Sequence, residues 1–176
     1  MKRQVIVEVD KEYLNYLAKA RGDMDTRSEV VMVIQRPDGR VLVNSKSFYP
    51  AGIFRLPSGG IHPGESPEDA FTRETLEETG LPSIIESTIA EIIHHCVCGE
   101  DSVDITSHIF LGSLSTQMPH PIDISEQISD YKEVDIAELR HIAHQLNHLT
   151  GKWQGFGRFR AVAHELVADY LSSFRT

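Results

Sequence analysis

An acidic cluster near the end of a helix constrains this chain more than any other feature of its sequence. Glu74, Glu77 and Glu78 are three and four positions apart, so on a helix they share one face. Their mutual repulsion costs roughly a few tenths of a kcal/mol per close pair, and the helix dipole disfavours negative charge in the last turn. A hard cation removes this conflict because it takes carboxylate oxygens as ligands. The spacing therefore predicts a metal site.

The boundaries of this helix are marked on both sides. Ser66 is a favourable N-cap residue, and Pro67 suits the first helical position. Asp69 follows Ser66 by three residues, as in a capping box, and Gly80 is placed to end the helix in a left-handed conformation. We therefore predict a helix over residues 67–79.

Neighbouring residues extend the acidic cluster. The planar guanidinium of Arg73 can orient a carboxylate, either Glu77 one turn later or Glu65 before the helix. The Gly59-Gly60 turn lets the backbone approach closely, and its carbonyl groups are candidate metal ligands. A solvated acidic helix face is the alternative interpretation of the glutamates alone.

Over residues 59–81 the complete spacing resembles the signature of the Nudix hydrolases. The matching residues are Gly59, Glu65, Arg73, Glu74, Glu77, Glu78, Gly80 and Leu81. Thr75 departs from the pattern, because the family usually has Ile, Leu or Val at that position. Its methyl group can still pack, so we expect only a slightly weaker contact between the helix and the sheet.

The resemblance implies a fold and an activity. Proteins of this family have a mixed central sheet between helices, so we expect an α/β domain of the α+β type, built as an α/β/α sandwich. They hydrolyse a nucleoside diphosphate linked to another group, with divalent cations such as Mg²⁺ or Mn²⁺. By position, Glu74, Glu77 and Glu78 would be the metal ligands, and the carbonyl of Ser58 or Gly59 a further one.

The resemblance also suggests catalytic roles for residues around the metal ligands. Glu65 and Arg73 resemble the pair that buttresses the loop and the helix in this family. The general base commonly comes from a loop outside the signature. Glu126 is the best candidate, since it lies just before a strand and helix that resemble the closing elements of the domain. The alternative for Glu126 is a solvent-facing loop residue.

Basic and aromatic residues indicate where a substrate could bind. Arg36, Lys46 and Arg55 lie near the glutamate loop in sequence and are candidate substrate contacts. Residues 152–160, which include Arg158, concentrate cations, aromatics and glycine in an acidic chain. Their rings could stack on a base and the arginine could bind a phosphate. The alternative is a helix N-terminus whose aromatics pack on the core.

Two other sets of metal-binding residue types are less favourable. His94, Cys96 and Cys98 alternate on a predicted strand, so their side chains project in parallel and converge poorly on one zinc ion. Three histidines at helical spacing within residues 141–148 lack an acidic partner, and a solvated or partly packed face is favoured for them.

The remaining segments predict a mixed order of strands and helices in a single domain, residues 1–176, with a strand-helix extension over 1–29. Residues 30–34 form a continuous apolar run, typical of a strand buried on both faces. Residues 41–43 follow a Pro-Asp-Gly turn and are its expected hairpin partner. Further strands are expected at 4–10, 53–56, 84–97, 103–111 and 132–134, and further helices at 11–20, 136–149 and 159–174.

Charge and composition limit the partners. The formal net charge of −9 disfavours long nucleic acid and anionic membranes. No apolar run approaches the roughly 18 residues that span a bilayer, and we recognise no secretory signal. Two cysteines make no disulfide framework, so a cytoplasmic location is expected. Residues 1–29 could cover a partner in a homodimer.

Several functions stay open on the sequence alone. The substrate of a hydrolase could be a nucleoside triphosphate, ADP-ribose, a nucleotide sugar, a dinucleoside polyphosphate or a capped RNA end. A second hypothesis is a nucleotide-sensing module that binds without cleaving, although such modules typically lose glutamates that are all present here. A third is a diphosphate isomerase, in which Cys96 or Cys98 would act with a glutamate. Fold analogy cannot separate these functions.

Overall fold

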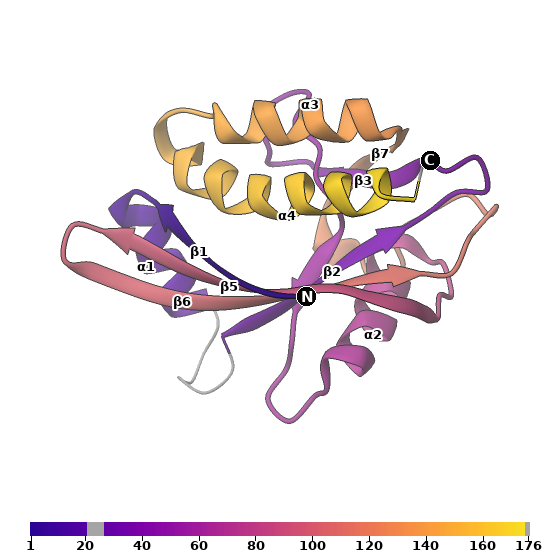
Figure 1. Ribbon diagram of the computed structural model, residues 1–176, viewed down its shortest axis with the longest axis horizontal. Helices are drawn as coiled ribbons and strands as arrows, with labels where there is room; N and C mark the ends of the chain where they lie inside the picture. The colour runs from indigo at the N-terminus through magenta and orange to yellow at the C-terminus, as the bar shows by residue number, and fades with distance from the viewer. Residues whose placement is uncertain (21–26, 175–176) are drawn as a thin grey trace.

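Figure 1 shows the computed structural model, which describes residues 1–20 and 27–174. The strands are β1 (Lys2–Glu8), β2 (Ser28–Ile34), β3 (Val41–Lys46), β4 (Ser58–Gly60), β5 (Ile85–Cys98), β6 (Asp101–Gly112) and β7 (Ile128–Val134). The helices are α1 (Lys11–Ala20), α2 (Pro67–Thr79), α3 (Ile136–Asn147) and α4 (Gln154–Ser172), with short 3₁₀ turns η1 (Ile124–Glu126) and η2 (Gly151–Trp153). Within the described ranges, no helix has the length and apolar character needed to cross a membrane.

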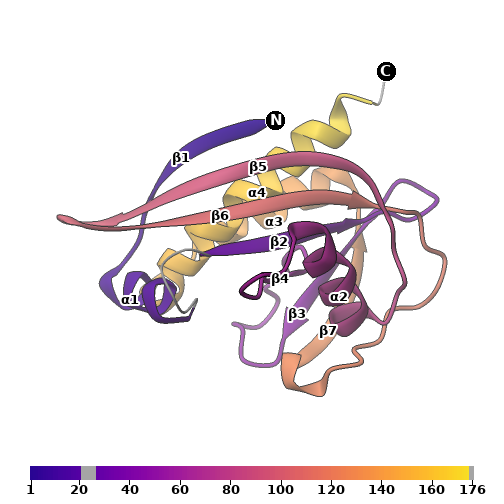
Figure 2. The same ribbon diagram turned by 90° about the horizontal axis from the view of Figure 1, so that it is seen from below.

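A mixed five-stranded sheet in the order β1-β5-β6-β2-β4 forms the centre of the molecule. β1 runs parallel to β5 and β6 parallel to β2, whereas β5–β6 and β2–β4 are antiparallel. β3 and β7 form a separate antiparallel ladder. α3 and α4 lie side by side over one face of the sheet, and α2 lies on the opposite side (Figures 1 and 2). The expected α/β sandwich with a mixed sheet is therefore confirmed.

β2 separates two hydrophobic clusters and holds α2 in place. Val31 and Val33 belong to the larger cluster, which also contains residues of α3 and α4. Val30 and Met32 point to the other side, into the smaller cluster that includes Phe71 of α2. Because both faces of β2 are buried, its apolar run is continuous rather than alternating.

The expected N-terminal strand and helix are both present. β1 pairs with β5 along its whole length at the edge of the sheet. Tyr13, Leu14 and Leu17 of α1 are buried and belong to the larger hydrophobic cluster. The strand and helix of the extension are thus packed on the same core as the rest of the chain, and the homodimer stays a prediction.

The prediction of a hairpin between β2 and β3 is wrong. The turn itself forms, with Gly39 at a φ of 84°, but only an isolated bridge between Gln35 and Val41 follows it. β6 and β4 already occupy the two edges of β2, so β3 has no free edge there and pairs with β7 instead.

The extent of other expected elements also differs. Residues 53–56 form no strand, since their one ladder contact is an isolated bridge between Arg55 and Asn44. The strand that follows is β4. β7 begins at Ile128 rather than 132, and α4 begins at Gln154 rather than 159. In both cases polar residues or glycines at the start of the element weakened the sequence signal, while pairing with β3 and packing on the core extend it.

Candidate active site

α2 begins and ends where the sequence predicted, and this places the acidic cluster in its C-terminal turns. The Ser66 hydroxyl accepts a hydrogen bond from the N–H of Asp69 at 3.1 Å. Gly80 adopts a φ of 66°, which favours glycine, and its N–H donates to the Leu76 carbonyl at 2.8 Å. The helix ends immediately after the glutamates.

The loop before η1 caps the last turn of α2. The N–H groups of Ile122 and Asp123 donate to the Glu77 carbonyl at 2.9 and 3.2 Å. The N–H of His120 donates to the Thr79 carbonyl at 2.9 Å. These bonds satisfy carbonyl groups that a helix end leaves unpaired, and they hold η1 against the acidic end of the helix.

Arg73 connects the loop before α2 to the glutamates on the helix. Its Nε and Nη2 each lie 2.8 Å from an oxygen of Glu65. Its Nη1 donates to Glu74 at 2.7 Å and to Glu77 at 3.0 Å, and Nη2 donates to the Gly60 carbonyl at 2.9 Å. Hydrogen bonding to Arg73 lowers the pKa of Glu65 to about 2, so this carboxylate stays ionised.

Glu74 lies directly on the backbone of the glycine turn. It is 5% exposed, and burial raises its pKa to about 7 in spite of the opposing charge of Arg73. A Cβ atom on Gly59 would lie 1.8 Å from Glu74 Cδ and 2.0 and 2.2 Å from the two carboxylate oxygens. Position 59 therefore has to be glycine for the Glu74 carboxylate to occupy this place.

Glu78 is fully buried and faces two cations. The Asn44 side-chain amide donates to Oε2 of Glu78 at 3.0 Å. Oε1 lies 3.4 Å from Lys46 Nζ and 3.6 Å from Arg55 Nη2. No described residue makes a hydrogen bond to this Oε1 atom.

The repulsion expected within the acidic cluster is offset by cations of the chain itself. Arg73 neutralises charge on the Glu77 side, and Lys46 and Arg55 do so for Glu78. Across residues 1–20 and 27–174, no set of three or more acidic, histidine or cysteine side chains is grouped as a metal site.

The donor atoms nevertheless fit a divalent cation. The Glu74 carboxylate lies against the Gly59 backbone with no side chain between them, and Oε1 of Glu78 lacks a hydrogen-bond donor. Carboxylate and carbonyl oxygens are the ligands that Mg²⁺ and Mn²⁺ prefer. The assignment of Glu74, Glu77 and Glu78 as ligands, with the Ser58 or Gly59 carbonyl, stays a prediction.

A cavity of about 500 Å³ opens beside Glu74. It brings together acidic, basic and backbone groups that lie far apart in the sequence. Near the acidic cluster its lining includes Ser58, Gly59, Gly60, Glu74, Lys46, Arg55, Arg160 and Glu126. Glu126 Oε2 lies 2.5 Å from Lys46 Nζ. The loop residue proposed from sequence as a base is thus in the same cavity as Glu74.

Two of the arginines that line this cavity share one serine. Arg55 Nη1 and Arg160 Nη1 donate to the Ser58 hydroxyl at 2.8 and 2.9 Å. Arg160 also pairs with buried Glu29 at 2.9 Å, and its Nε has no hydrogen-bond partner among the described residues. Sequence reasoning had singled out Arg158 in this segment, but Arg160 is the arginine that lines the cavity.

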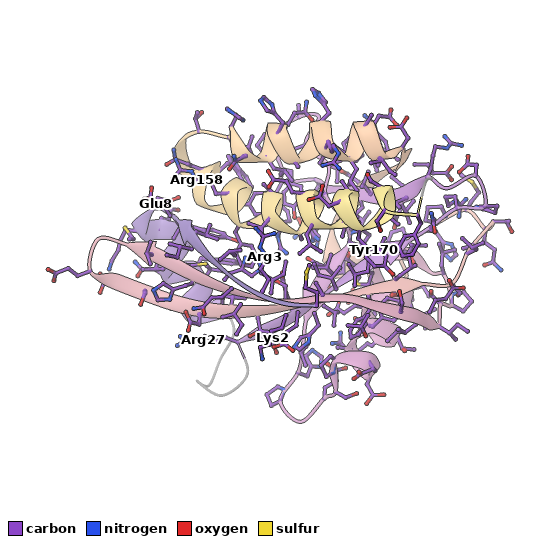
Figure 3. The ribbon with its side chains drawn as sticks, in the orientation of Figure 1. Lys2, Arg3, Glu8, Arg27, Arg158 and Tyr170 are labelled. Carbon is purple, nitrogen blue, oxygen red and sulfur yellow. The ribbon has the colours of Figure 1, made fainter. Side chains whose placement is uncertain are left out.

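Arg36 and Arg158 do not line the cavity and are engaged elsewhere. Arg36 is buried, and its Nε pairs with Glu133 at 2.7 Å. Arg158 donates to the Glu8 carbonyl at 3.2 Å, and Figure 3 shows the two residues near each other at the start of α4 and the end of β1. The structure therefore does not support these two arginines as substrate contacts.

The strand histidine and cysteines have other surroundings. His94 Nε2 lies 3.0 Å from the Ser107 hydroxyl, and burial lowers the His94 pKa to about 4. Cys96 is buried, and burial raises its pKa to about 12. Neither Cys96 nor Cys98 lines the cavity, so neither is placed to act there as an acid or base for an isomerase.

Sequence reasoning missed one wall of the cavity altogether. It is formed by Glu12, Tyr13 and Tyr16 of α1 and by Phe48 and Tyr49 after β3. No local pattern indicated this, because the position of α1 beside the cavity depends on contacts with α4 and the central sheet. The exposure of Tyr16 and Phe48 marks this wall, but exposure is recognised only in the folded structure.

Comparison with known proteins adds independent findings. The NUDIX domain family matches residues 25–153, which is most of the chain. The NAD-capped RNA hydrolase NUDT12 of Macaca fascicularis is 30% identical over 146 residues, covering 81% of this chain and 29% of that protein. The chain thus spans less than a third of the length of this relative.

Two solved structures share the fold. The NUDIX domain of Shewanella oneidensis NrtR complexed with ADP ribose aligns with a TM-score of 0.57 at 17% identity, covering 93% of this chain and 99% of that one. A C. elegans Ap4A hydrolase binary complex aligns with a TM-score of 0.54 at 18% identity, covering 84% and 98%. Together with the family match over residues 25–153, the fold and the glutamate helix show that the chain belongs to the NUDIX domain family.

Proposed function

We propose that this chain hydrolyses a diphosphate linkage in a nucleoside diphosphate derivative, with Mg²⁺ or Mn²⁺ as cofactor. The observation that carries the proposal is the placement of Glu74 and Glu126 in one cavity that Lys46, Arg55 and Arg160 also line. Such a cavity offers oxygen ligands for a metal and positive charge for phosphate groups.

The roles of the chain's own residues follow from their surroundings. Lys46, Arg55 and Arg160 bind the negative charges of the diphosphate. Glu126, on the η1 loop, accepts the proton of the attacking water. A divalent cation, when bound, would offset the charge of the diphosphate and polarise the phosphorus under attack.

The class of diphosphate derivative is a finer question. A nucleoside triphosphate, ADP-ribose, a nucleotide sugar, a dinucleoside polyphosphate and a capped RNA end all carry the linkage. The names of the similar proteins include an NAD-capped RNA hydrolase and an Ap4A hydrolase, and the NrtR domain was solved with ADP ribose. The net charge of −9 opposes contacts along a long RNA but not the entry of its end into the cavity.

The proposal is tested by incubating the protein with Mg²⁺ or Mn²⁺ and a panel of these derivatives, and identifying products by mass spectrometry. We expect cleavage of one class of substrate, its loss in EDTA, and a decrease of at least about 100-fold in kcat for Glu77→Gln and Glu78→Gln. Circular dichroism establishes that each variant is folded.

The competing function is a module that binds a nucleotide without cleaving it. The observation on its side is that Lys46 and Arg55 flank Glu78, so a phosphate could be held by these cations without a metal. Tight binding of one panel member, without cleavage in the presence of either Mg²⁺ or Mn²⁺, would favour the binding function over hydrolysis.

Glu126→Gln is expected to reduce kcat at least about tenfold, because an amide cannot accept a proton from water. The fold should persist, since the backbone bonds of the preceding loop to α2 do not involve this side chain. Glu86→Gln is the matched control, as it removes an exposed carboxylate outside the cavity. Equal kcat for the Glu126 variant and the control would remove Glu126 from the mechanism.

A further inference from the structure

A continuous series of aromatic rings also lines this cavity. Each ring lies close to the next, with centroid distances between 5.0 and 6.4 Å. In order, the rings are Tyr16, Tyr13, Phe156, Trp153, Tyr49 and Phe48, and all of them line the cavity. We call this series the aromatic wall.

Parts of the chain outside the family match supply half of the aromatic wall. Tyr13 and Tyr16 belong to α1 and Phe156 to α4, whereas the match covers residues 25–153. Gly155 allows α1 to approach α4, because a Cβ there would lie 2.8 Å from Tyr13 Cβ. The properties shared by the family therefore do not explain this half of the wall.

The rings at the two ends of the wall are exposed, while those in the middle are not. Tyr13 and Phe156 are only 7% and 8% exposed, and their place in the hydrophobic cluster explains them. Tyr16 and Phe48 are 56% and 52% exposed, because each has a ring neighbour on one side only. Packing within the chain leaves open faces on these two rings.

Basic side chains connect the aromatic wall to the acidic cluster. Arg55 donates to the Tyr49 hydroxyl at 2.7 Å and lies 3.6 Å from Oε1 of Glu78. Arg160 lies over the ring of Phe156. A nucleotide has the same sequence of parts, since a planar base is joined through ribose to phosphate. Aromatic faces bind bases by stacking without requiring hydrogen bonds to a particular base.

We propose that the aromatic wall is a nucleobase-binding subsite, in which the base stacks on the exposed ring of Tyr16 at the α1 end of the wall. This inference rests on the proposed function for the nature of the ligand. It assigns a base-binding role to α1, which lies outside the matched family residues. The phosphate end of the ligand then lies toward Lys46, Arg55 and Arg160.

Trp153 provides a direct readout, because it is the only tryptophan in the chain and it is half-buried in the aromatic wall. We would titrate the protein with adenosine 5′-monophosphate and, separately, with ribose 5-phosphate, in Mg²⁺. Both are monophosphates without an anhydride bond, so turnover does not complicate the titration. We expect saturable quenching of Trp153 fluorescence by the adenosine compound and binding at least about tenfold weaker for the compound without a base.

Variants at Tyr16 separate stacking from a general change in structure. Tyr16→Ala should raise the Kd for adenosine 5′-monophosphate about tenfold, whereas Tyr16→Phe, which keeps the ring, should retain the affinity. Phe174→Ala is the matched control, because Phe174 is also exposed, at 68%, but lies outside the cavity. It should bind as the unaltered protein does.

The outcomes distinguish this inference from the proposed function. Quenching that depends on the base and on the Tyr16 ring, without cleavage of any diphosphate, would support the subsite and contradict the hydrolase. Cleavage of a nucleoside diphosphate derivative with the same KM in Tyr16→Ala, together with no base-dependent quenching, would overturn the subsite and leave the hydrolase standing.

Discussion

Replacing Gly59 with alanine is expected to reduce kcat/KM for the diphosphate substrate by about 100-fold or more while leaving the fold intact. The added Cβ would lie 1.8 to 2.2 Å from the carboxylate atoms of Glu74, so that carboxylate has to move. Gly59 is not among the glycines with a positive φ, so alanine fits the backbone itself. Steady-state kinetics and thermal unfolding measure the two effects separately.

Gly99→Ala is the control for this substitution and should show the opposite pattern. Gly99 lies in the turn between β5 and β6 at a φ of 62°, and an added Cβ there meets no other atom within 4 Å. Alanine in a left-handed conformation costs about 1 kcal/mol or more, so the melting temperature should fall while kcat/KM is unchanged. Normal kinetics for Gly59→Ala would show that Glu74 need not rest on this backbone for catalysis.

The features that sequence reasoning predicted well are those determined by local chemistry. α2 begins at the Ser66 cap and ends at Gly80 because both signals act within one turn of the helix. The two-sided burial of β2 was also predictable, since an uninterrupted apolar strand has no solvent face.

The pairing of β3 could not be predicted from its own residues. Its turn signal, Pro-Asp-Gly, is a good hairpin signal, and the turn does form. The partner of β3 is decided elsewhere, because β6 and β4 fill both edges of β2 and β7 is left with a free edge. Such competition for edges involves strands far apart in sequence, and a local pattern cannot report it.

In the candidate site, too, local contacts could be predicted from the sequence, whereas the orientation of distant elements could not. Spacing alone indicated that Arg73 could pair with Glu65 or Glu77, and the structure shows that it contacts both. In the segment 152–160, composition indicated a role but not which arginine faces the cavity. That is decided by the orientation of α4, which directs Arg160 to Glu29 and Ser58 and Arg158 to Glu8.

Arg73→Lys is the second substitution with a large expected effect. The guanidinium of Arg73 contacts three carboxylates and the Gly60 carbonyl at the same time. An ammonium group keeps the charge but not the planar fork, so it cannot bind Glu65 through two parallel hydrogen bonds and also reach Glu74 and Glu77. We expect kcat to fall about 100-fold, because a displacement of about 1 Å in a catalytic group costs this much.

Arg140→Lys is the matched control, because Arg140 pairs with Asp169 at 2.8 Å on the surface, away from the cavity. An exposed ion pair of this kind contributes little, so this variant should keep both its kcat and its melting temperature. If Arg73 served only to neutralise the glutamates, lysine would do so equally well and kcat would be retained. Loss of kcat with retained charge would therefore show that the geometry of the guanidinium, which joins the glycine turn to α2, is what positions Glu74 for the reaction.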